Sequence, residues 1–359
     1  MVRFIALFLL FILPLIFVPF IPFGFETPKV VIAELLIETG IVITVLKKDF
    51  SLRHFHPTQL KLILALIILA VFQSMLGPTD FLGNVFRHQG VFLLWHLLLW
   101  SLMATQFDLK IPKNLPLITL VLLLTSSAFL LGGNQAGRAF GTLGEPNALA
   151  TTTVFILPFL LFNLKWFYPI LGAILAFGII FLSGSRSGLE ALLTELLFLI
   201  LIKIRLATTK AFAVCLILLA ISLTTPLIEG GSWFENRAEV WQTALQSGLE
   251  SPLFGHGFGN MEQAFHETAV RLNNNIQYQV VDSAHNFLLD WWVQGGTLGL
   301  VIFLSTLSLS LKNLLVRHDL ALLAASLGLL VSLSFNPVSV VNLAAFWWLI
   351  GQGFKTSQT

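Results

Sequence analysis

The stretch "VVDSAHNFLLDWWVQGGTLGL", at 280–300, places polar side chains at the start of a long apolar run. Its histidine, His285, belongs to the residue type whose ordinary pKa of about 6.5 allows it to accept a proton at neutral pH. Asn286 follows it, and Trp291 and Trp292 are typical of a membrane interface. His285 is therefore a candidate general base. The simpler interpretation is a polar residue at the N-terminus of a helix.

Arginines form the second set of candidates. Arg186 lies in the tight segment "SGSRSG", and Arg237 lies in "ENRAEVWQTAL", four residues before Trp241. A guanidinium group presents a fixed fork of donors that matches phosphate and carboxylate oxygens. Both arginines are therefore candidates to bind an anionic substrate. The simpler alternatives are a pair between Arg186 and Glu190 one helical turn later, and a solvated helix charge at Arg237.

Two further arginines fit the same idea less closely. Arg87 begins the segment "RHQG" before an apolar run, and Arg138 precedes "GTLGEPNALA". Glu145 in that second segment would need a cation or a hydroxyl partner if it lay near an anionic ligand. Arg138 is equally well interpreted as the charge of a mobile loop.

The composition indicates which kind of protein positions these residues. Of the 359 residues, 56% are hydrophobic and 11% are charged, and the mean hydropathy is +0.88. Soluble domains carry about 25% charged residues, so this chain is predicted to be a polytopic membrane protein. A net charge of +2 is too small to suggest a nucleic-acid partner. Cys215 is the only cysteine, which excludes an intramolecular disulfide.

Apolar runs long enough to cross a bilayer recur along the chain, since a spanning helix needs about 20 such residues. The first run is not followed by a small-residue cleavage site and is predicted to be a retained span rather than a signal peptide. We therefore predict an all-α integral membrane protein with about twelve transmembrane helices, near 3–23, 30–46, 60–76, 88–106, 115–131, 147–163, 167–183, 187–203, 211–228, 288–311, 319–335 and 338–354.

The basic residues orient these spans. With the N-terminus in the cytoplasm and strict alternation, the inner loops receive fourteen of the twenty Lys and Arg residues, as the positive-inside rule predicts. Both termini are then cytoplasmic. The outer side receives six basic residues, of which five are arginines, and these need a reason other than topology: Lys29, Arg87, Arg138, Arg186, Arg237 and Arg271.

The connection 229–284 is the longest hydrophilic segment, and it is predicted to lie on the outer side. Hydrophobic residues recur at near-helical spacing in "SWFENRAEVWQTALQSG", and a turn and a second amphipathic helix follow. The chain thus divides into spans one to nine at 1–228, a helical cap at 229–284, and spans ten to twelve at 285–359.

These segments resemble the O-antigen ligase and Wzy-type polymerase family of bacterial membrane glycosyltransferases. The resemblance covers the whole topology, with twelve spans and one large outer loop before the tenth. It also covers the S-R-x-G motif at 185–188, the arginine and tryptophan at 237 and 241, the P-x-x-G-x-G motif at 252–257, and the His-Asn pair that begins the tenth span.

The resemblance implies a fold related to the GT-C glycosyltransferases, in the bacterial inner membrane, with the active site on the periplasmic face. It implies a donor glycan on undecaprenyl diphosphate, an acceptor that is a glycan or a lipid core, and no metal or other cofactor. His285 would be the catalytic histidine, and Arg186 and Arg237 would bind the diphosphate. Lesser roles would fall to Arg87 and Arg138 at the diphosphate and to Asn286, Trp241 and Glu190 as supporting residues.

Several alternatives remain open. A ligase and a polymerase would use the same donor and differ in the acceptor, which no motif identifies. His256 and His266 are rival bases in the same loop. A transporter or flippase is the alternative from another class, because Glu34 and Glu38 lie one turn apart within a span and buried carboxylates in a membrane are usually paired or functional.

Overall fold

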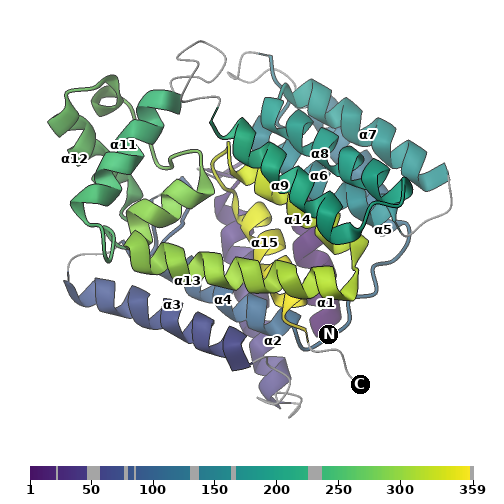
Figure 1. Ribbon diagram of the computed structural model, residues 1–359, viewed down its shortest axis with the longest axis horizontal. Helices are drawn as coiled ribbons and strands as arrows, with labels where there is room; N and C mark the ends of the chain where they lie inside the picture. Colours follow the sequence, from purple (N-terminus) through teal and green to yellow (C-terminus); the bar gives the residue numbers. More distant parts are fainter. Residues whose placement is uncertain are drawn as a thin grey trace.

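The protein is all-helical in the computed structural model, which describes residues 1–21, 23–46, 57–76, 80–84, 86–129, 137–162, 167–224 and 237–355. No strand occurs in these ranges, which confirms the predicted all-α class. Figure 1 shows a broad bundle in which one long helix, α13, crosses the whole molecule beneath two shorter groups of helices.

Each predicted span corresponds to a helix at nearly the predicted position. From the second span onward the helices are α2 (Thr27–Leu46), α3 (Pro57–Leu76), α4 (Val91–Ala104), α5 (Leu115–Phe129), α6 (Pro146–Leu161), α7 (Phe167–Ser183), α8 (Arg186–Lys203), α9 (Thr208–Ser222), α13 (Phe287–Arg317), α14 (Leu320–Leu333) and α15 (Val340–Gly353).

The first span is shorter than predicted. Helix α1 (Val2–Leu7) continues through a π-helical turn (Phe8–Ile12) and a 3-10 turn (Leu13–Leu15) and then stops, although the apolar run extends to 23. Pro14 lies within the 3-10 turn, and the backbone beyond it is extended at Ile16. A proline removes a helical hydrogen bond and favours such an end.

Two helices in the described part of the chain, Pro57–Met75 and Phe287–Arg317, are long and apolar enough to cross a membrane by themselves. Eight other apolar helices of this part have 10–17 residues, and α2 and α8 are long enough but carry more charged residues, so the number of spans remains a prediction. The outward faces nevertheless carry large apolar side chains, such as Ile68, Ile174, Phe181 and Ile217 with exposed fractions of 65%, 63%, 74% and 59%. Such faces suit contact with lipid rather than with water.

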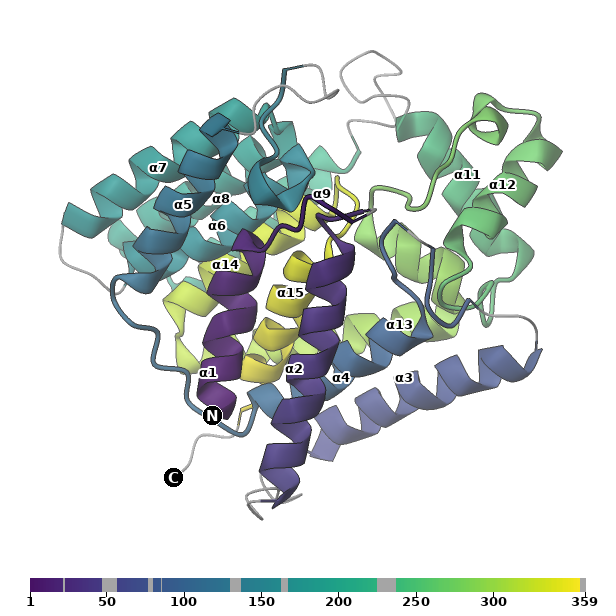
Figure 2. The same ribbon diagram turned by 180° about the vertical axis from the view of Figure 1, so that it is seen from behind.

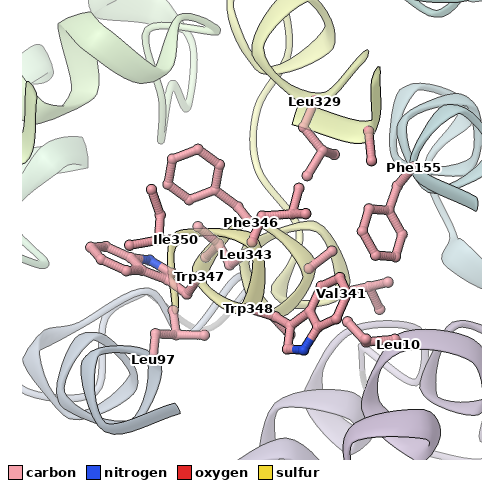
Figure 3. Close-up of a cluster of buried hydrophobic side chains, with 14 of the residues drawn as sticks. Leu10, Leu97, Phe155, Leu329, Val341, Leu343, Phe346, Trp347, Trp348 and Ile350 are labelled. Carbon is pink, nitrogen blue, oxygen red and sulfur yellow. The ribbon is translucent and has the colours of Figure 1, made fainter. Parts of the chain in front are cut away.

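Helix α15 lies in the middle of the bundle, between α1 and α2 on one side and α13 on the other (Figures 1 and 2). All of its residues are buried, including Phe346, Trp347 and Trp348. Figure 3 shows Trp347 pointing from α15 toward Leu97 of α4, and Trp348 on the side of α15 that faces Phe155 of α6. This core holds in place the loop that precedes α15.

Trp291 belongs to the same core. It is 5% exposed, and its ring stacks on Phe303 with centroids 4.5 Å apart. The interpretation of Trp291 as an interfacial anchor is therefore wrong. Trp292, the next residue, points away from this core and donates its indole N–H to the carbonyl of Leu245 at 3.4 Å.

Helix α13 is interrupted at Gly296, which has a φ of 61°. The segment 251–257 crosses the helix at this break: Thr297 N–H donates to Pro252 at 2.8 Å, and Gly257 N–H donates to Gln294 at 3.0 Å. A Cβ on Gly296 would lie 2.5 Å from the nitrogen of Gly255. The close neighbour that requires glycine at 296 is therefore a loop.

Between α9 and α13 the chain forms α11 (Arg237–Glu250), α12 (Met261–Leu272) and a 3-10 turn (Asn275–Tyr278). Figure 1 shows α11 and α12 side by side beyond the start of α13, away from the group α5 to α9. A separate buried cluster, which includes Trp241, Phe265 and Phe335, joins them to the bundle. The predicted helix partners Trp233 and Phe234 lie outside the described residues, and the covering role of the predicted cap at 229–284 stays a prediction.

Candidate active site

His285 lies in the short turn between the segment 280–284 and α13. Its φ is 55°, a left-handed conformation that non-glycine residues rarely adopt. Asn286 begins the helix, because its side-chain oxygen accepts the N–H groups of Leu288 at 3.0 Å and Leu289 at 3.2 Å. This N-cap fixes where α13 begins, so His285 lies just before the helix rather than within it.

Asp290, one turn inside α13, holds this turn in place. One of its carboxylate oxygens accepts the N–H of Ala284 at 2.7 Å, and the other accepts the hydroxyl of Ser283 at 2.8 Å. The hydroxyl of Ser283 in turn accepts the N–H of His285 at 3.0 Å. The strained backbone at His285 is thus fixed from both sides, as strained residues at functional sites usually are.

The imidazole of His285 is oriented by one backbone contact. Its Nδ1 lies 3.1 Å from the carbonyl oxygen of Ser283, and a carbonyl can only accept, so Nδ1 carries the proton. In the neutral ring Nε2 then has a free lone pair. Burial first, and then the nearby charges of Arg237 and Arg87, lower the pKa of His285 to about 4. The ring is therefore neutral at pH 7 and can accept a proton through Nε2.

Trp241 and Arg237 on α11 approach this turn from the other side. The indole N–H of Trp241 donates to the carbonyl of Ala284 at 3.1 Å. Its ring stacks on Phe335, with centroids 6.2 Å apart and planes inclined by 25°. Arg237, one turn earlier, donates from Nη1 to the backbone carbonyl of Phe335. The supporting role predicted for Trp241 thus has a structural basis, since it links the His285 turn to the loop that Arg237 contacts.

Arg186 belongs to α8, whose start contacts the same loop, the one that connects α14 to α15. It is the first residue of α8, it is exposed, and Ser185 caps the helix by accepting the N–H of Gly188 at 3.2 Å. Its neighbour Ser187 accepts a hydrogen bond from the amide of Asn336 at 2.5 Å. Arg237 therefore contacts the loop between α14 and α15 at Phe335, and Ser187, the residue after Arg186, contacts the same loop at Asn336.

Arg87 makes ion pairs inside the protein. Its Nε donates to Asp282 at 2.7 Å and its Nη1 to Glu145 at 3.3 Å, and Nη1 also reaches the carbonyl of Val338 at 3.5 Å. The two carboxylates raise the pKa of Arg87 although burial opposes them. Arg87 thereby ties the segment before α4 to the starts of α6 and α13. The guanidinium group of Arg87 is therefore the cationic partner of Glu145.

Arg138 and Glu190 also have internal partners. Arg138 donates from Nε to the carbonyl of Ser183 at 2.8 Å and from Nη2 to Asn147 at 3.0 Å, so it fastens the end of α7 to the start of α6. Glu190, predicted to support Arg186, shares a hydrogen bond with Ser222 of α9. These contacts give both residues a structural function.

Three carboxylates of this region were not singled out from the sequence: Asp282, Asp290 and Glu26. Glu26 precedes α2. Its carboxylate accepts the N–H of Val340, the first residue of α15, at 2.6 Å. Burial raises the pKa of Glu26 to about 7. In the sequence these three residues could be recognised only as acidic residues beside apolar runs. Nothing in the local sequence distinguishes them from ordinary interfacial charges.

The rival bases lie elsewhere. His256 donates from Nε2 to the carbonyl of Ser247, 2.8 Å away, and so holds α11 to the loop that crosses α13. His266 is exposed on the surface of α12.

Glu38 of α2 contacts His96 of α4 at 3.1 Å, so it is paired rather than isolated. Among the described residues, no group of three or more His, Cys, Asp or Glu side chains could hold a metal ion.

Comparison with known proteins supports the resemblance seen in the sequence. Residues 171–304 match the family model described as O-antigen ligase. An O-antigen ligase of Pseudomonas aeruginosa is 30% identical over 193 residues, which cover 51% of this chain and 45% of that protein. The chain thus aligns with less than half of that relative. The matched region includes Arg186, Arg237 and His285 and the two helices α11 and α12.

Proposed function

We propose that the chain is a member of the O-antigen ligase family and transfers a glycan from undecaprenyl diphosphate to an acceptor hydroxyl at the periplasmic face of the bacterial inner membrane. One observation carries the assignment of the base: the contact of 3.1 Å between Nδ1 of His285 and the carbonyl of Ser283 leaves Nε2 free to accept a proton. No metal takes part in this scheme.

The reaction is a single displacement with inversion at the anomeric carbon. The acceptor hydroxyl loses its proton to Nε2 of His285, and its oxygen forms a new bond to the anomeric carbon. The bond from that carbon to the diphosphate oxygen breaks, and its electron pair stays on the diphosphate. A diphosphate is a good leaving group, so the step needs a base near the hydroxyl more than an acid near the leaving oxygen.

Arg186 and Arg237 hold the diphosphate in this proposal. Arg237 contacts Phe335, and Ser187, the residue after Arg186, contacts Asn336 in the same loop, so we place the diphosphate between the two guanidinium forks. Fixed donors stabilise the charge that accumulates as the sugar leaves. Arg87 acts differently from the sequence-based prediction: with Asp282 and Glu145 as partners, it positions the turn that carries His285.

A bound diphosphate would also change the pKa of His285. The positive charge of Arg237 is one of the causes that lower the pKa of His285. A bound diphosphate opposes that charge, so it raises the pKa of His285 toward its ordinary value. The histidine therefore becomes a stronger base only when the donor is in place, which favours transfer in the complex over reaction without a donor.

A Wzy-type polymerase reaction is the second candidate, since the family includes it and the donor chemistry is the same. It would differ in the acceptor, which would be a second lipid-linked glycan. A transporter or flippase is the candidate from another class, and it would move the lipid-linked glycan without breaking a bond.

Reconstitution tests these proposals. The purified chain in liposomes is given a lipid-diphosphate glycan with either a lipid-core acceptor or a second donor, and product and released undecaprenyl diphosphate are measured. We expect release that depends on an acceptor, and a loss of about 10²- to 10⁴-fold for His285→Ala, as removal of a general base usually causes. His266→Ala is the matched control and should retain activity. Full activity of folded His285→Ala would refute the assignment, and translocation without release would favour the transporter.

A further inference from the structure

A cavity of about 400 Å³ lies at the end of the bundle opposite His285. It is formed by the segment 108–113, the start of α14 and the end of α15. Helix α13 connects the two sites, because His285 precedes its first residue and Asp319 follows its end. A helix of 31 residues rises about 1.5 Å per residue, so the sites are tens of ångströms apart. The volume is within the range of about 300–1,000 Å³ typical of ligand sites.

The acidic side chains in the wall of this cavity already have partners. Asp108 forms an ion pair with Lys355. Asp319 caps α14 by accepting the N–H of Leu322 at 3.3 Å. The ion pair offsets the charge of Asp108, whereas Asp319 keeps its negative charge while it caps α14.

The two lysines in the wall, Lys110 and Lys113, are different. Both are exposed, and neither has a hydrogen bond or an ion pair to another residue in the described part of the chain. Lysine is a compact charge with three donors and serves widely as a phosphate ligand. Apart from the Asp108–Lys355 pair, the wall thus carries two lysines against the single carboxylate of Asp319, and its net charge is positive.

Other cations lie at the same end. Arg317 donates to the carbonyls of Gln352 at 2.7 Å and Lys355 at 3.1 Å, and Arg3 is close enough to Lys355 to lower its pKa. Under the predicted orientation this end faces the cytoplasmic leaflet, whose anionic lipids attract basic segments. The neighbourhood thus favours a negatively charged ligand that can be reached from the membrane surface.

We propose that this cavity binds a phosphate group through Lys110 and Lys113, with a phospholipid headgroup or free phosphate as its source. The proposal does not depend on the transfer reaction, because the site lies at the other end of the bundle.

Thermal unfolding of the full-length protein in a neutral detergent tests the site. Three probes are titrated separately: dioctanoyl phosphatidylglycerol, dioctanoyl phosphatidylcholine and inorganic phosphate. We expect a saturable rise in Tm with phosphatidylglycerol. Lys110→Gln/Lys113→Gln should weaken its apparent affinity about tenfold or more, as loss of charge-assisted contacts does. A rise with phosphate alone identifies free phosphate as sufficient, whereas a rise only with the lipids identifies the headgroup.

The matched control removes two exposed lysines from the same predicted side but outside the cavity. Lys203→Gln/Lys312→Gln should bind each probe as the unmodified protein does. The proposal is overturned if no probe raises Tm in a saturable manner, or if both double variants bind equally well. Native mass spectrometry of the purified variants gives a second readout, since retained phospholipid should decrease only in the cavity variant.

Discussion

Asp290 accepts the backbone N–H of Ala284 at 2.7 Å, so a residue inside α13 holds the turn that precedes this helix. The contact lies directly next to His285, and the same carboxylate also accepts the hydroxyl of Ser283. The position of the candidate base is therefore set by a side chain that does not itself need to meet the substrate.

Replacing Asp290 with alanine should release this turn. It would leave the buried N–H of Ala284 without its acceptor, which costs about 1–3 kcal/mol. We expect a lower Tm and a lower rate of transfer, with donor binding less affected than turnover. Asp290→Asn keeps an acceptor oxygen for Ala284 and should recover much of the stability. An Asp290→Ala protein with normal turnover would show that the turn is held by other contacts.

The low pKa of His285 predicts an unusual pH profile. With a value of about 4 in the free protein, the ring stays neutral as the pH falls through 6.5. The pH dependence of kcat/KM reports the free enzyme, and that of kcat reports the complex. We therefore expect kcat/KM to decline only as the pH approaches about 4, and kcat to decline at a higher pH because the bound diphosphate opposes Arg237. A midpoint near 6.5 in kcat/KM would contradict the buried, cation-flanked environment of His285.

Conservative replacement of the two arginines should still impair transfer. A lysine keeps the charge at Arg237 or Arg186 but lacks the planar fork. Hydrogen bonds to charged groups contribute about 1.5–3 kcal/mol, so each replacement should reduce kcat/KM by roughly 10- to 100-fold. Arg271→Lys is the control, because Arg271 pairs with Glu250 on the exposed side of α12. If Arg186→Lys and Arg237→Lys transferred at the unmodified rate, simple charge would be sufficient.

Glu26 should contribute a stability change near neutral pH. Its pKa is about 7 in the folded protein and about 4.5 when unfolded, so the folded state binds the proton more tightly. This contribution to stability is fully present below about 4.5 and is lost as the pH rises through about 7. Glu26→Gln keeps an oxygen for Val340 N–H and removes the titration.

The corresponding measurement is Tm in detergent at pH 5 and pH 8. The unmodified protein should lose more stability at pH 8 than Glu26→Gln does. Glu267→Gln, on the exposed face of α12, should behave like the unmodified protein. Identical pH dependence in Glu26→Gln would mean that burial does not control the ionisation of Glu26.

The helices themselves were predictable from the sequence, because the hydropathy of a segment is a local property. The apolar runs matched helices within a few residues, and the predicted start of the tenth at 288 lies next to Asn286, which caps it. The exceptions had local causes that act against hydropathy, such as Pro14 in the first span and the left-handed φ at Gly296 in α13.

The identity of His285, Arg186 and Arg237 as candidates was also available from residue types, order and family resemblance. Their surroundings were not. That Arg87 is held by Asp282 and Glu145, residues 195 and 58 positions away, depends on which helix ends meet. The sequence does not show whether the guanidinium group of an arginine binds a substrate or an internal carboxylate.

The sequence by itself determined an all-helical, membrane-type chain and the residue types able to handle an anionic donor. Only the tertiary structure decided that Arg237 and the start of α8, which carries Arg186, meet one loop, and that Asp290 and Trp241 hold the turn of His285 from opposite sides. The physical reason is that the apolar pattern of a helix depends only on residues that are close together in the sequence. Hydrogen bonds and the pKa shift of His285 arise from burial and from charges that folding brings together from distant segments.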